Sequence, residues 1–152
     1  MKGEWKWHKM ECKFCNGELE RWIIKKFKYW TIYLAKNQYY LGRVYVALNR
    51  HGPEKTTELT KEEWAELKEI NDRLAIALSS LYKYDLINYL VTQGRDRYHF
   101  HMHLVPRHEN AINFYGEEFK DEMWGKLPFP TPKREFNEKI LNKIKEDIKK
   151  II

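Results

Sequence analysis

Histidine and apolar residues alternate along one stretch of the chain, and this alternation restricts what the stretch can fold into. The stretch reads Tyr98-His99-Phe100-His101-Met102-His103-Leu104-Val105-Pro106-Arg107. In a β-strand, residues i, i+2 and i+4 lie on one face. We therefore expect a strand over residues 98–105 that turns its histidines to one side and its apolar residues toward a core. Pro106 has no N–H for the sheet ladder, so the strand is predicted to end there.

The residues alone leave three uses of this histidine face open. Imidazoles of alternate strand residues can bind one catalytic metal ion such as zinc, with an open position for water. One histidine can instead attack phosphorus as a nucleophile while the others orient the substrate. The histidines can also be polar surface residues of an edge strand, although the apolar opposite face disfavours this reading.

The composition favours one folded domain and no membrane partner. The chain has 152 residues, of which 43% are hydrophobic and 15% aromatic, enough for a core without disulfide bonds. No apolar run approaches the roughly 20 residues that cross a bilayer. The first residues, Met1 to Lys6, lack the apolar segment of a signal peptide, which favours a cytoplasmic location.

The formal net charge of +6 favours anionic partners such as nucleotides or nucleic acid. Lysine and glutamate are both abundant and are mixed along the chain, a usage that is also typical of thermophile proteins. The charge therefore does not decide between a small nucleotide and a nucleic acid, and a nucleic-acid partner is the less favoured of the two.

The chain has two cysteines, Cys12 and Cys15, in a Cys-x-x-Cys motif. In a chain expected in the cytoplasm, this spacing indicates a metal-binding or redox function rather than a structural disulfide. Two cysteines do not complete a zinc site, so histidines would have to supply the remaining ligands. The alternative is that both are free buried cysteines in a core.

Periodicity predicts the remaining elements. Strands are expected at 21–25, 29–35, 42–48 and 85–92, from their β-branched and aromatic content. A long helix should begin at Thr60, which forms a capping box with Glu63, and end near Tyr82. Its apolar stripe is Trp64, Leu67, Ile70, Leu74, Leu78 and Leu81. Residues 106–134 should be irregular, followed by a C-terminal helix with apolar residues at Phe136, Ile140, Ile144 and Ile148.

This order of elements predicts an α+β fold. We expect an antiparallel sheet of about five strands, one long helix packed on it, and a C-terminal helix on the same face. The chain is interpreted as a single domain over 1–152, with a core at 12–107 and a C-terminal extension at 108–152.

The histidine stretch resembles the signature of the histidine triad (HIT) superfamily of nucleotide hydrolases and transferases. That signature is His-φ-His-φ-His-φ-φ, where φ is apolar, and His99 to Val105 agree with it at every position. Residues 42–51 also resemble the family's strand that ends in a histidine. Ile87-Asn88-Tyr89 and Gly94 resemble the strand before the triad, so the resemblance covers about residues 12–107.

The resemblance implies a covalent mechanism on a nucleotide. His101 would attack the α-phosphorus and form a nucleotidyl-histidine, and water would then release the nucleoside monophosphate. His103 would hydrogen-bond the phosphate oxygens, and Asn88 would help to bind the substrate. Dinucleoside polyphosphates, such as diadenosine tetraphosphate, or adenosine phosphoramidates are the expected substrates. The alternatives are a nucleotidyltransferase, or a nucleotide- or nucleic-acid-binding module with little turnover.

The resemblance also implies a zinc site and a homodimer. Some family members have a zinc site whose matching residues here are Cys12, Cys15, His51 and His99. Such a Cys2His2 site has no open position, so the zinc would be structural rather than catalytic. Family members of this size usually form homodimers through the helix and an adjoining strand.

The sequence departs from the family pattern at two places that contact the substrate. Ala35 stands where many members have an Asp or Asn that contacts the ribose. Arg95, Asp96 and Arg97 stand where many members have Gln and Ser or Thr. The two arginines would bind a polyphosphate bidentately or else cap a surface turn. Substrate choice is therefore the least determined part of the interpretation.

Overall fold

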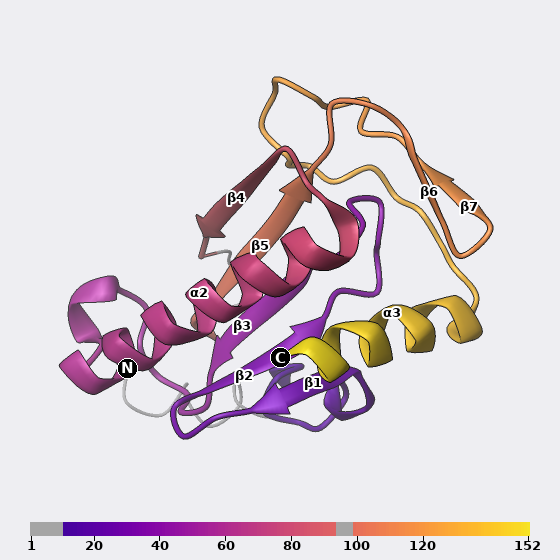
Figure 1. Cartoon of the computed structure of the whole chain (residues 1–152). Helices are drawn as coiled ribbons and strands as arrows, with labels where there is room; N and C mark the ends of the chain where they lie inside the picture. Colours follow the sequence, from indigo (N-terminus) through magenta and orange to yellow (C-terminus); the bar gives the residue numbers. More distant parts are fainter. Residues whose placement is uncertain (1–10, 94–98) are drawn as a thin grey trace.

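A five-stranded antiparallel sheet is the centre of the computed structural model, which describes residues 11–93 and 99–152 (Figure 1). Its strands stand in the order β1-β2-β3-β5-β4. Their bounds are β1 Ile23–Lys26, β2 Trp30–Leu34, β3 Val44–Leu48, β4 Leu86–Val91 and β5 His101–Arg107. Two short 3-10 helices, η1 at Glu20–Trp22 and η2 at Thr56–Glu58, lie in the connections. The predicted α+β class and the number of strands are confirmed.

Helices α2 and α3 cover the same face of the sheet, as Figure 1 shows. Helix α2 spans Lys61–Tyr82, and its N-cap Thr60 forms the predicted reciprocal capping box with Glu63. Helix α3 spans Glu138–Ile151, and Asn137 caps it by accepting a hydrogen bond from the N–H of Ile140. No helix in the described residues has the length and apolarity needed to cross a membrane.

The core lies between this helical layer and the sheet. Helix α2 contributes the predicted stripe, but Trp64 is an exception, because its side chain is 42% exposed. Trp30 of β2 joins the two layers, since its indole N–H donates to the carbonyl of Glu63 over 2.7 Å. Helix α2 contributes the buried core residues Leu67, Ile70, Leu74, Leu78 and Tyr82. Helix α3 contributes Leu141, Ile144 and Ile148 to the same core.

Strand register places the histidines on the opposite face from the helices. Phe100, just before β5, and Leu104 within it belong to the core, and residues in alternate positions point the other way. His101 pairs with Ala47 of β3, and His103 pairs with Tyr45. Because paired residues in an antiparallel sheet share a face, the histidines lie beside Tyr45 and the β2 residue Tyr33, which pairs with it.

Two predictions were wrong, one about where the histidine strand ends and one about the segment that follows it. Strand β5 continues through Pro106 to Arg107. Pairing with β3 stops at Leu104, so at Pro106 the strand has a neighbour only on the β4 side. A missing N–H there costs no ladder bond to β3. The segment predicted to be irregular also contains a hairpin, β6 (Ile112–Phe114) and β7 (Glu117–Phe119).

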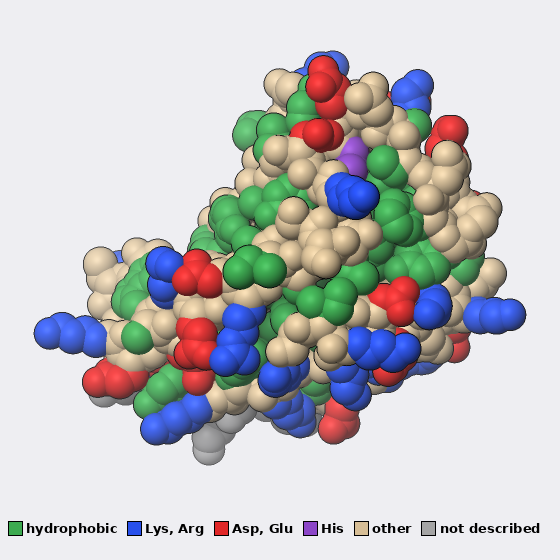
Figure 2. All heavy atoms as spheres, viewed as in Figure 1, with side chains coloured by type: hydrophobic (Ala, Val, Ile, Leu, Met, Phe, Trp, Pro, Cys, Tyr) green, Lys and Arg blue, Asp and Glu red, His purple; other side chains and the backbone are tan. Residues whose placement is uncertain are grey.

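Charges of both signs are mixed on the helical face of the molecule. Figure 2 shows Lys and Arg side chains interspersed with Asp and Glu over this face. Several are paired along the helices, as in the contacts of Lys68 with Asp72 at 2.6 Å and Arg73 with Glu69 at 2.6 Å. On this face, the excess positive charge is therefore not gathered into one surface patch, which does not favour a nucleic-acid interface there.

Candidate active site and metal centre

A tight turn brings the two cysteines to the histidine face of the sheet. The N–H groups of Cys15 and Asn16 both donate to the carbonyl of Cys12, at 3.0 and 2.9 Å. The side chain of Asn16 then accepts from the N–H of Glu18, and Gly17 takes a positive φ of 83°. This geometry turns both thiols to the same side of the loop, toward the start of the histidine stretch.

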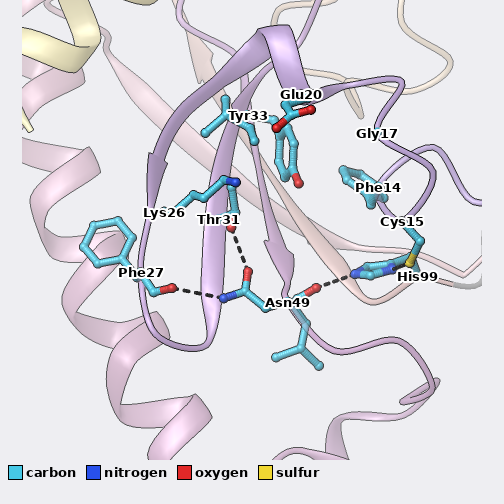
Figure 3. A pocket seen from close by; sticks show the side chains of 12 residues that line it. Phe14, Cys15, Gly17, Glu20, Lys26, Phe27, Thr31, Tyr33, Asn49 and His99 are labelled. Atoms are coloured by element: carbon cyan, nitrogen blue, oxygen red, sulfur yellow. Dashed lines mark hydrogen bonds between the residues drawn. The ribbon is translucent and has the colours of Figure 1, made fainter.

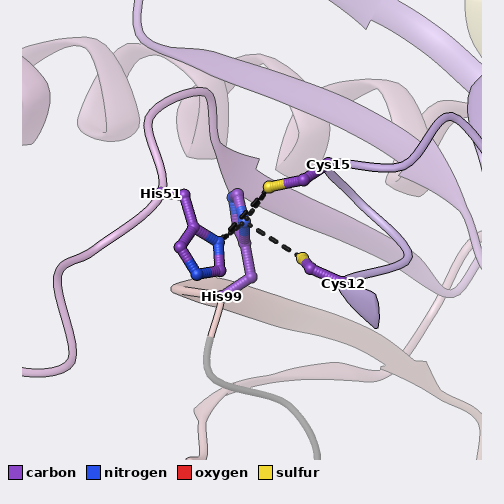
Figure 4. A group of neighbouring side chains, drawn as sticks. All are labelled: Cys12, Cys15, His51 and His99. Carbon is purple, nitrogen blue, oxygen red and sulfur yellow. Dashed lines mark hydrogen bonds between the residues drawn. The ribbon is translucent and has the colours of Figure 1, made fainter. Parts of the chain in front are cut away.

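Four side chains meet there: Cys12, Cys15, His51 and His99 (Figure 4). Their ligand atoms all lie within 4.8 Å of one another. Nδ1 of His99 is 3.4 Å from Sγ of Cys12, 3.3 Å from Sγ of Cys15 and 3.2 Å from Nδ1 of His51. Nδ1 of His51 is 3.3 Å from Sγ of Cys15. The structure therefore brings together all four residues predicted to form the metal site.

These separations fit a tetrahedral zinc site. Zn–N bonds of about 2.0–2.1 Å and Zn–S bonds of about 2.3 Å place tetrahedral N atoms about 3.3 Å apart and N and S atoms about 3.6 Å apart. The set has four protein ligands, so it leaves no open position and suits a structural rather than a catalytic ion.

A hydrogen bond from Nε2 of His99 leaves its other ring nitrogen, Nδ1, able to bind a metal ion. Its Nε2–H donates to the carbonyl of Leu48, which leaves the lone pair on Nδ1, the atom that faces the cysteines. Burial lowers the pKa of His99 to about 4, so the ring is neutral near pH 7, as metal binding requires.

The other two histidines of the run form a separate, hydrogen-bonded pair. Both are buried, and Nε2 of His101 is 3.1 Å from Nε2 of His103. Nδ1 of His101 is 2.7 Å from the carbonyl of His99. A carbonyl only accepts, so Nδ1 of His101 carries the proton and its Nε2 carries the lone pair. The family resemblance assigned His99 to a metal site and His101 and His103 to the reaction, but it did not predict the direct contact between the rings of His101 and His103.

Arg43 and Phe129 adjoin this pair, and sequence reasoning missed both. Nη2 of Arg43 is 3.4 Å from Nδ1 of His103, and the ring of Phe129 lies 5.0 Å from the His103 ring. The signal for Arg43 was its position two residues before Tyr45, on the same side of the strand that pairs with the histidines. Phe129 lies in an irregular segment, and no periodicity in the sequence points to it.

A buried ion pair anchors the segment that carries Phe129. Arg107 donates to Asp121 over 2.5 Å and to the carbonyls of Met123 and Lys126 over 2.6 and 3.1 Å. The side chains of Arg107 and Asp121 are 3% and 5% exposed. Asn88, which was predicted to bind substrate, accepts from Arg107 over 2.9 Å. Asn88 therefore lies beside the Arg107–Asp121 ion pair that holds the C-terminal segment.

A hollow of about 330 Å³ adjoins the cluster of Cys12, Cys15, His51 and His99 on this face (Figure 3). Its lining includes Phe14, Tyr33, Thr31, Asn49 and His99. The ring of Phe14 lies 5.2 Å from that of Tyr33, 5.2 Å from that of His99 and 5.1 Å from that of His101. Phe14 thus connects the cysteine loop with both parts of the histidine run.

Two predicted site residues, Arg95 and Arg97, lie outside the described residues. Their assignment to substrate binding stays a prediction from the sequence. The residue predicted to depart from the ribose-contacting pattern, Ala35, is fully buried beside β2.

Solved structures of histidine triad proteins share this fold. A histidine triad nucleotide-binding protein from Sulfolobus tokodaii is 18% identical, covers 91% of this chain and 90% of its own, and has a TM-score of 0.67. A zinc-bound histidine triad family protein from Mycobacterium smegmatis is 18% identical, covers 93% and 96%, and has a TM-score of 0.61. A diadenosine triphosphate hydrolase from Plasmodium falciparum is 12% identical, covers 87% and 74%, and has a TM-score of 0.57.

The sequence itself matches no family model and no curated protein. At these identities the structural likeness establishes the fold, and the site rests on the geometry of this chain. The register of β5 places the histidine run on the open face of a five-stranded sheet, and two helices cover the other face. The chain therefore has the histidine triad fold, with the His-x-His-x-His motif of that superfamily at the centre of its candidate site.

Proposed function

We propose that this chain is a nucleotide hydrolase that cleaves at the α-phosphate through a covalent nucleotidyl intermediate on His101. The observation that carries the proposal is the arrangement of protons on His101. Its Nδ1–H donates to the carbonyl of His99, so the lone pair stands on Nε2, beside His103. A neutral imidazole held in this way is a nucleophile that needs no further deprotonation.

In the first step, Nε2 of His101 attacks the α-phosphorus and the bond to the leaving group breaks. His103 lies on the same face and donates to a phosphate oxygen, which stabilises the charge that develops there. Water then attacks the phosphorus, the P–N bond breaks, and the nucleoside monophosphate leaves. The rigid strand keeps the two rings in register, so orientation costs little at the moment of reaction.

The proposed substrates are dinucleoside polyphosphates or adenosine phosphoramidates. Aromatic rings beside the histidine pair support a nucleotide, because a base stacks on such rings. The rings of Phe14, Tyr33 and Tyr45 form this group, with centroid distances from Phe14 of 5.2 and 6.3 Å. The buried guanidinium of Arg43 next to His103 supports the more anionic of the two substrate classes.

We also propose that the four-residue cluster holds a structural zinc ion. Cys12, Cys15, His51 and His99 would be its ligands, and the ion would supply a cross-link between the N-terminal loop and the sheet. The loop between the cysteines places the ring of Phe14 against the ring of His101 on the histidine face.

A homodimer is the proposed assembly, through the edge strand β4. This strand ends the sheet order, and its residues Leu86, Tyr89 and Val91 are 41%, 44% and 37% exposed. An edge strand with exposed apolar side chains is a surface for pairing with another strand. Light scattering should give twice the monomer mass for the parent and a lower mass for Tyr89→Lys. Leu127→Lys, at a residue that is 75% exposed elsewhere, is the matched control and should leave the mass unchanged.

The test of the activity is a substrate panel with the parent protein and His101→Ala. Diadenosine tetraphosphate, diadenosine triphosphate, adenosine phosphoramidate and a nucleotide sugar are incubated separately, and the products are resolved by chromatography. The parent should release a nucleoside monophosphate from at least one, and His101→Ala should not. His108→Gln is the control, because the buried His108 ring donates to the carbonyl of Tyr82, away from the site. Equal activity of His101→Ala and the parent would overturn the assignment.

A further inference from the structure

Arg43 is held firmly at the start of β3, on the histidine face. Its carbonyl accepts from Nε2 of Gln38 over 2.8 Å and from the N–H of Ala35 over 3.2 Å. Its own N–H donates to the carbonyl of Tyr40 over 3.1 Å. The preceding Gly42 has a positive φ of 87°, and a Cβ there would meet Tyr82 at 3.0 Å. The backbone of Arg43 therefore has little freedom to move.

The side chain of Arg43 is equally confined. It is buried, and its guanidinium carbon lies 5.4 Å from the ring centre of Tyr45 and 5.5 Å from that of Phe129. A guanidinium between two aromatic faces is stabilised by cation–π contact and keeps its orientation. This orientation turns Nη2 toward Nδ1 of His103, at 3.4 Å.

We propose that Arg43 is a positioning residue that fixes which nitrogen of His103 carries the proton. The inference rests on the proposed function, because it takes Nε2 of His101 as the attacking atom. Arginine stays charged and has no acceptor, so Nδ1 of His103 must present its lone pair to Arg43. The neutral ring then carries its proton on Nε2, and this N–H donates to Nε2 of His101.

The hydrogen bonds run in one direction, from Arg43 through His103 and His101 to the carbonyl of His99, because one end can only donate and the other can only accept. At one end Arg43 only donates, and at the other end the carbonyl of His99 only accepts. Two neutral rings with one proton each satisfy all three contacts in the chain. The reverse order would set a lone pair against the carbonyl of His99 and an N–H against Arg43. Both ends therefore favour the arrangement with the lone pair on Nε2 of His101.

Without Arg43, the carbonyl of His99 still orients His101, and the contact with Nε2 of His101 becomes the remaining one of these two restraints on the His103 proton. The proton then sits on Nδ1 part of the time, and in that state Nε2 has no hydrogen to donate to the phosphate. A histidine in the wrong tautomer lowers the rate while the fold stays intact. The expected effect is thus on proton position and chemistry, rather than on stability alone.

The experiment uses the full-length, zinc-loaded protein with ¹⁵N-labelled histidine. Long-range ¹H–¹⁵N spectra of the parent should show His103 protonated on Nε2 and His101 protonated on Nδ1. In Arg43→Met, the Nδ1 and Nε2 shifts of His103 should move toward each other, as expected for two exchanging tautomers. The single-turnover rate with a substrate that the parent cleaves should fall by about 10²-fold. Arg43→Lys keeps a donor without an acceptor and should restore the parent spectrum in part, with a rate loss within about tenfold.

Arg134→Met is the matched control. Arg134 also lies close to two aromatic rings, Phe119 at 4.9 Å and Phe136 at 4.5 Å, but it contacts Glu117 and Glu118 instead of a histidine. Its loss should leave the histidine spectrum and the rate unchanged. Thermal unfolding establishes that each variant is folded, and if Arg43→Met is not, Arg43→Gln takes its place.

Two results would overturn the proposal. One is a parent-like His103 spectrum in a folded variant without Arg43. The other is a rate loss in Arg134→Met as large as that in Arg43→Met. The spectra need no substrate, so a protein that cleaves none of the panel contradicts the proposed function while the tautomer result still decides this inference.

Discussion

The two parts of the histidine run use the same residue type in opposite ways. His99 donates through Nε2 to the carbonyl of Leu48 and turns Nδ1 toward Cys12 and Cys15. His101, two residues later, donates through Nδ1 to the carbonyl of His99 and turns Nε2 toward His103. Each ring presents the nitrogen that its carbonyl partner leaves unprotonated. The position of a backbone carbonyl, rather than the residue type, thus decides which ring nitrogen each histidine presents to its other neighbours.

The surroundings of the two parts differ as well. In the first part, two sulfur and two nitrogen atoms face one another, and a metal ion bound by all four would have no position left for a substrate. The second part is bordered by Tyr45, Arg43 and Phe129, which come from β3 and from the C-terminal segment. If the division is correct, substitutions at one part should spare the property that belongs to the other.

The largest effect should come from His101→Ala. Loss of a nucleophile should lower kcat by at least about 10⁴-fold, which corresponds to about 5.5 kcal/mol of barrier. Because His101 is absent from the metal-binding cluster, zinc content should equal that of the parent. Steady-state kinetics and elemental analysis measure the two quantities on one preparation. Loss of zinc together with activity would show that the two parts are not separate.

The reverse separation should follow from Cys12→Ser. A serine hydroxyl replaces a zinc ligand, so elemental analysis should show little bound zinc. The free energy of unfolding should fall by about 4 to 6 kcal/mol, a fraction of the roughly 10–16 kcal/mol that structural zinc supplies to zinc-finger peptides. Chemical denaturation measures this change. Lys13→Ser, at the exposed residue beside Cys12, is the control and should keep both zinc and stability.

Local sequence patterns predicted most of the elements that hold the histidine run in place. The capping box at Thr60 and Glu63 marks the start of α2, because both interactions are made by residues three apart in the sequence. Alternation in residues 99–104 similarly separates the histidine face from the core. The metal-binding set came from the family resemblance, which pairs a Cys-x-x-Cys motif with two distant histidines. The structure brings these four residues together.

The rest depends on contacts that sequence periodicity does not encode. Pro106 was expected to end its strand, but whether a missing N–H is costly depends on where β3 ends, which is a property of the whole sheet. Trp64 fits the apolar stripe of α2, but it lies in the first turn, and its ring is 42% exposed. Phe129 meets His103 because long-range contacts hold its segment, among them those of Arg107 with residues 121–126 and of Tyr40 with Pro128.

The next largest effect should come from this anchor. Asp121→Ala leaves the Arg107 guanidinium buried without its carboxylate, which should lower the free energy of unfolding by about 3 to 5 kcal/mol. Activity at a temperature where the variant is folded should fall too, because Phe129 and Arg43 lose their support. Zinc content should not change. Glu122→Ala, at the exposed neighbouring residue, is the control for denaturation and kinetics, and an equal loss in both variants would contradict a special role for the ion pair.

The smallest effect, and the sharpest test of the division, should come from Phe14→Ala. Phe14 belongs to the cysteine loop, yet its ring contacts His99 at 5.2 Å and His101 at 5.1 Å, so it is the side chain that joins the two parts. Its ring is no ligand, so zinc should remain bound. If the ring stacks on a base, kcat/KM for a nucleotide substrate should fall by about tenfold, in line with the roughly 1–3 kcal/mol of a base–aromatic contact.

The Phe14 variant also separates two ways in which the cysteine loop can affect the reaction. Phe27→Ala removes a ring that lies beside Arg73 of α2, far from Phe14 and His99, and should leave kcat/KM within about twofold. A loss confined to KM in Phe14→Ala places the ring in substrate binding, whereas a loss confined to kcat places it in the orientation of His101. Zinc loss in this variant would instead mean that the loop folds as one unit with its aromatic residue, and the two parts of the histidine run would then be coupled through Phe14.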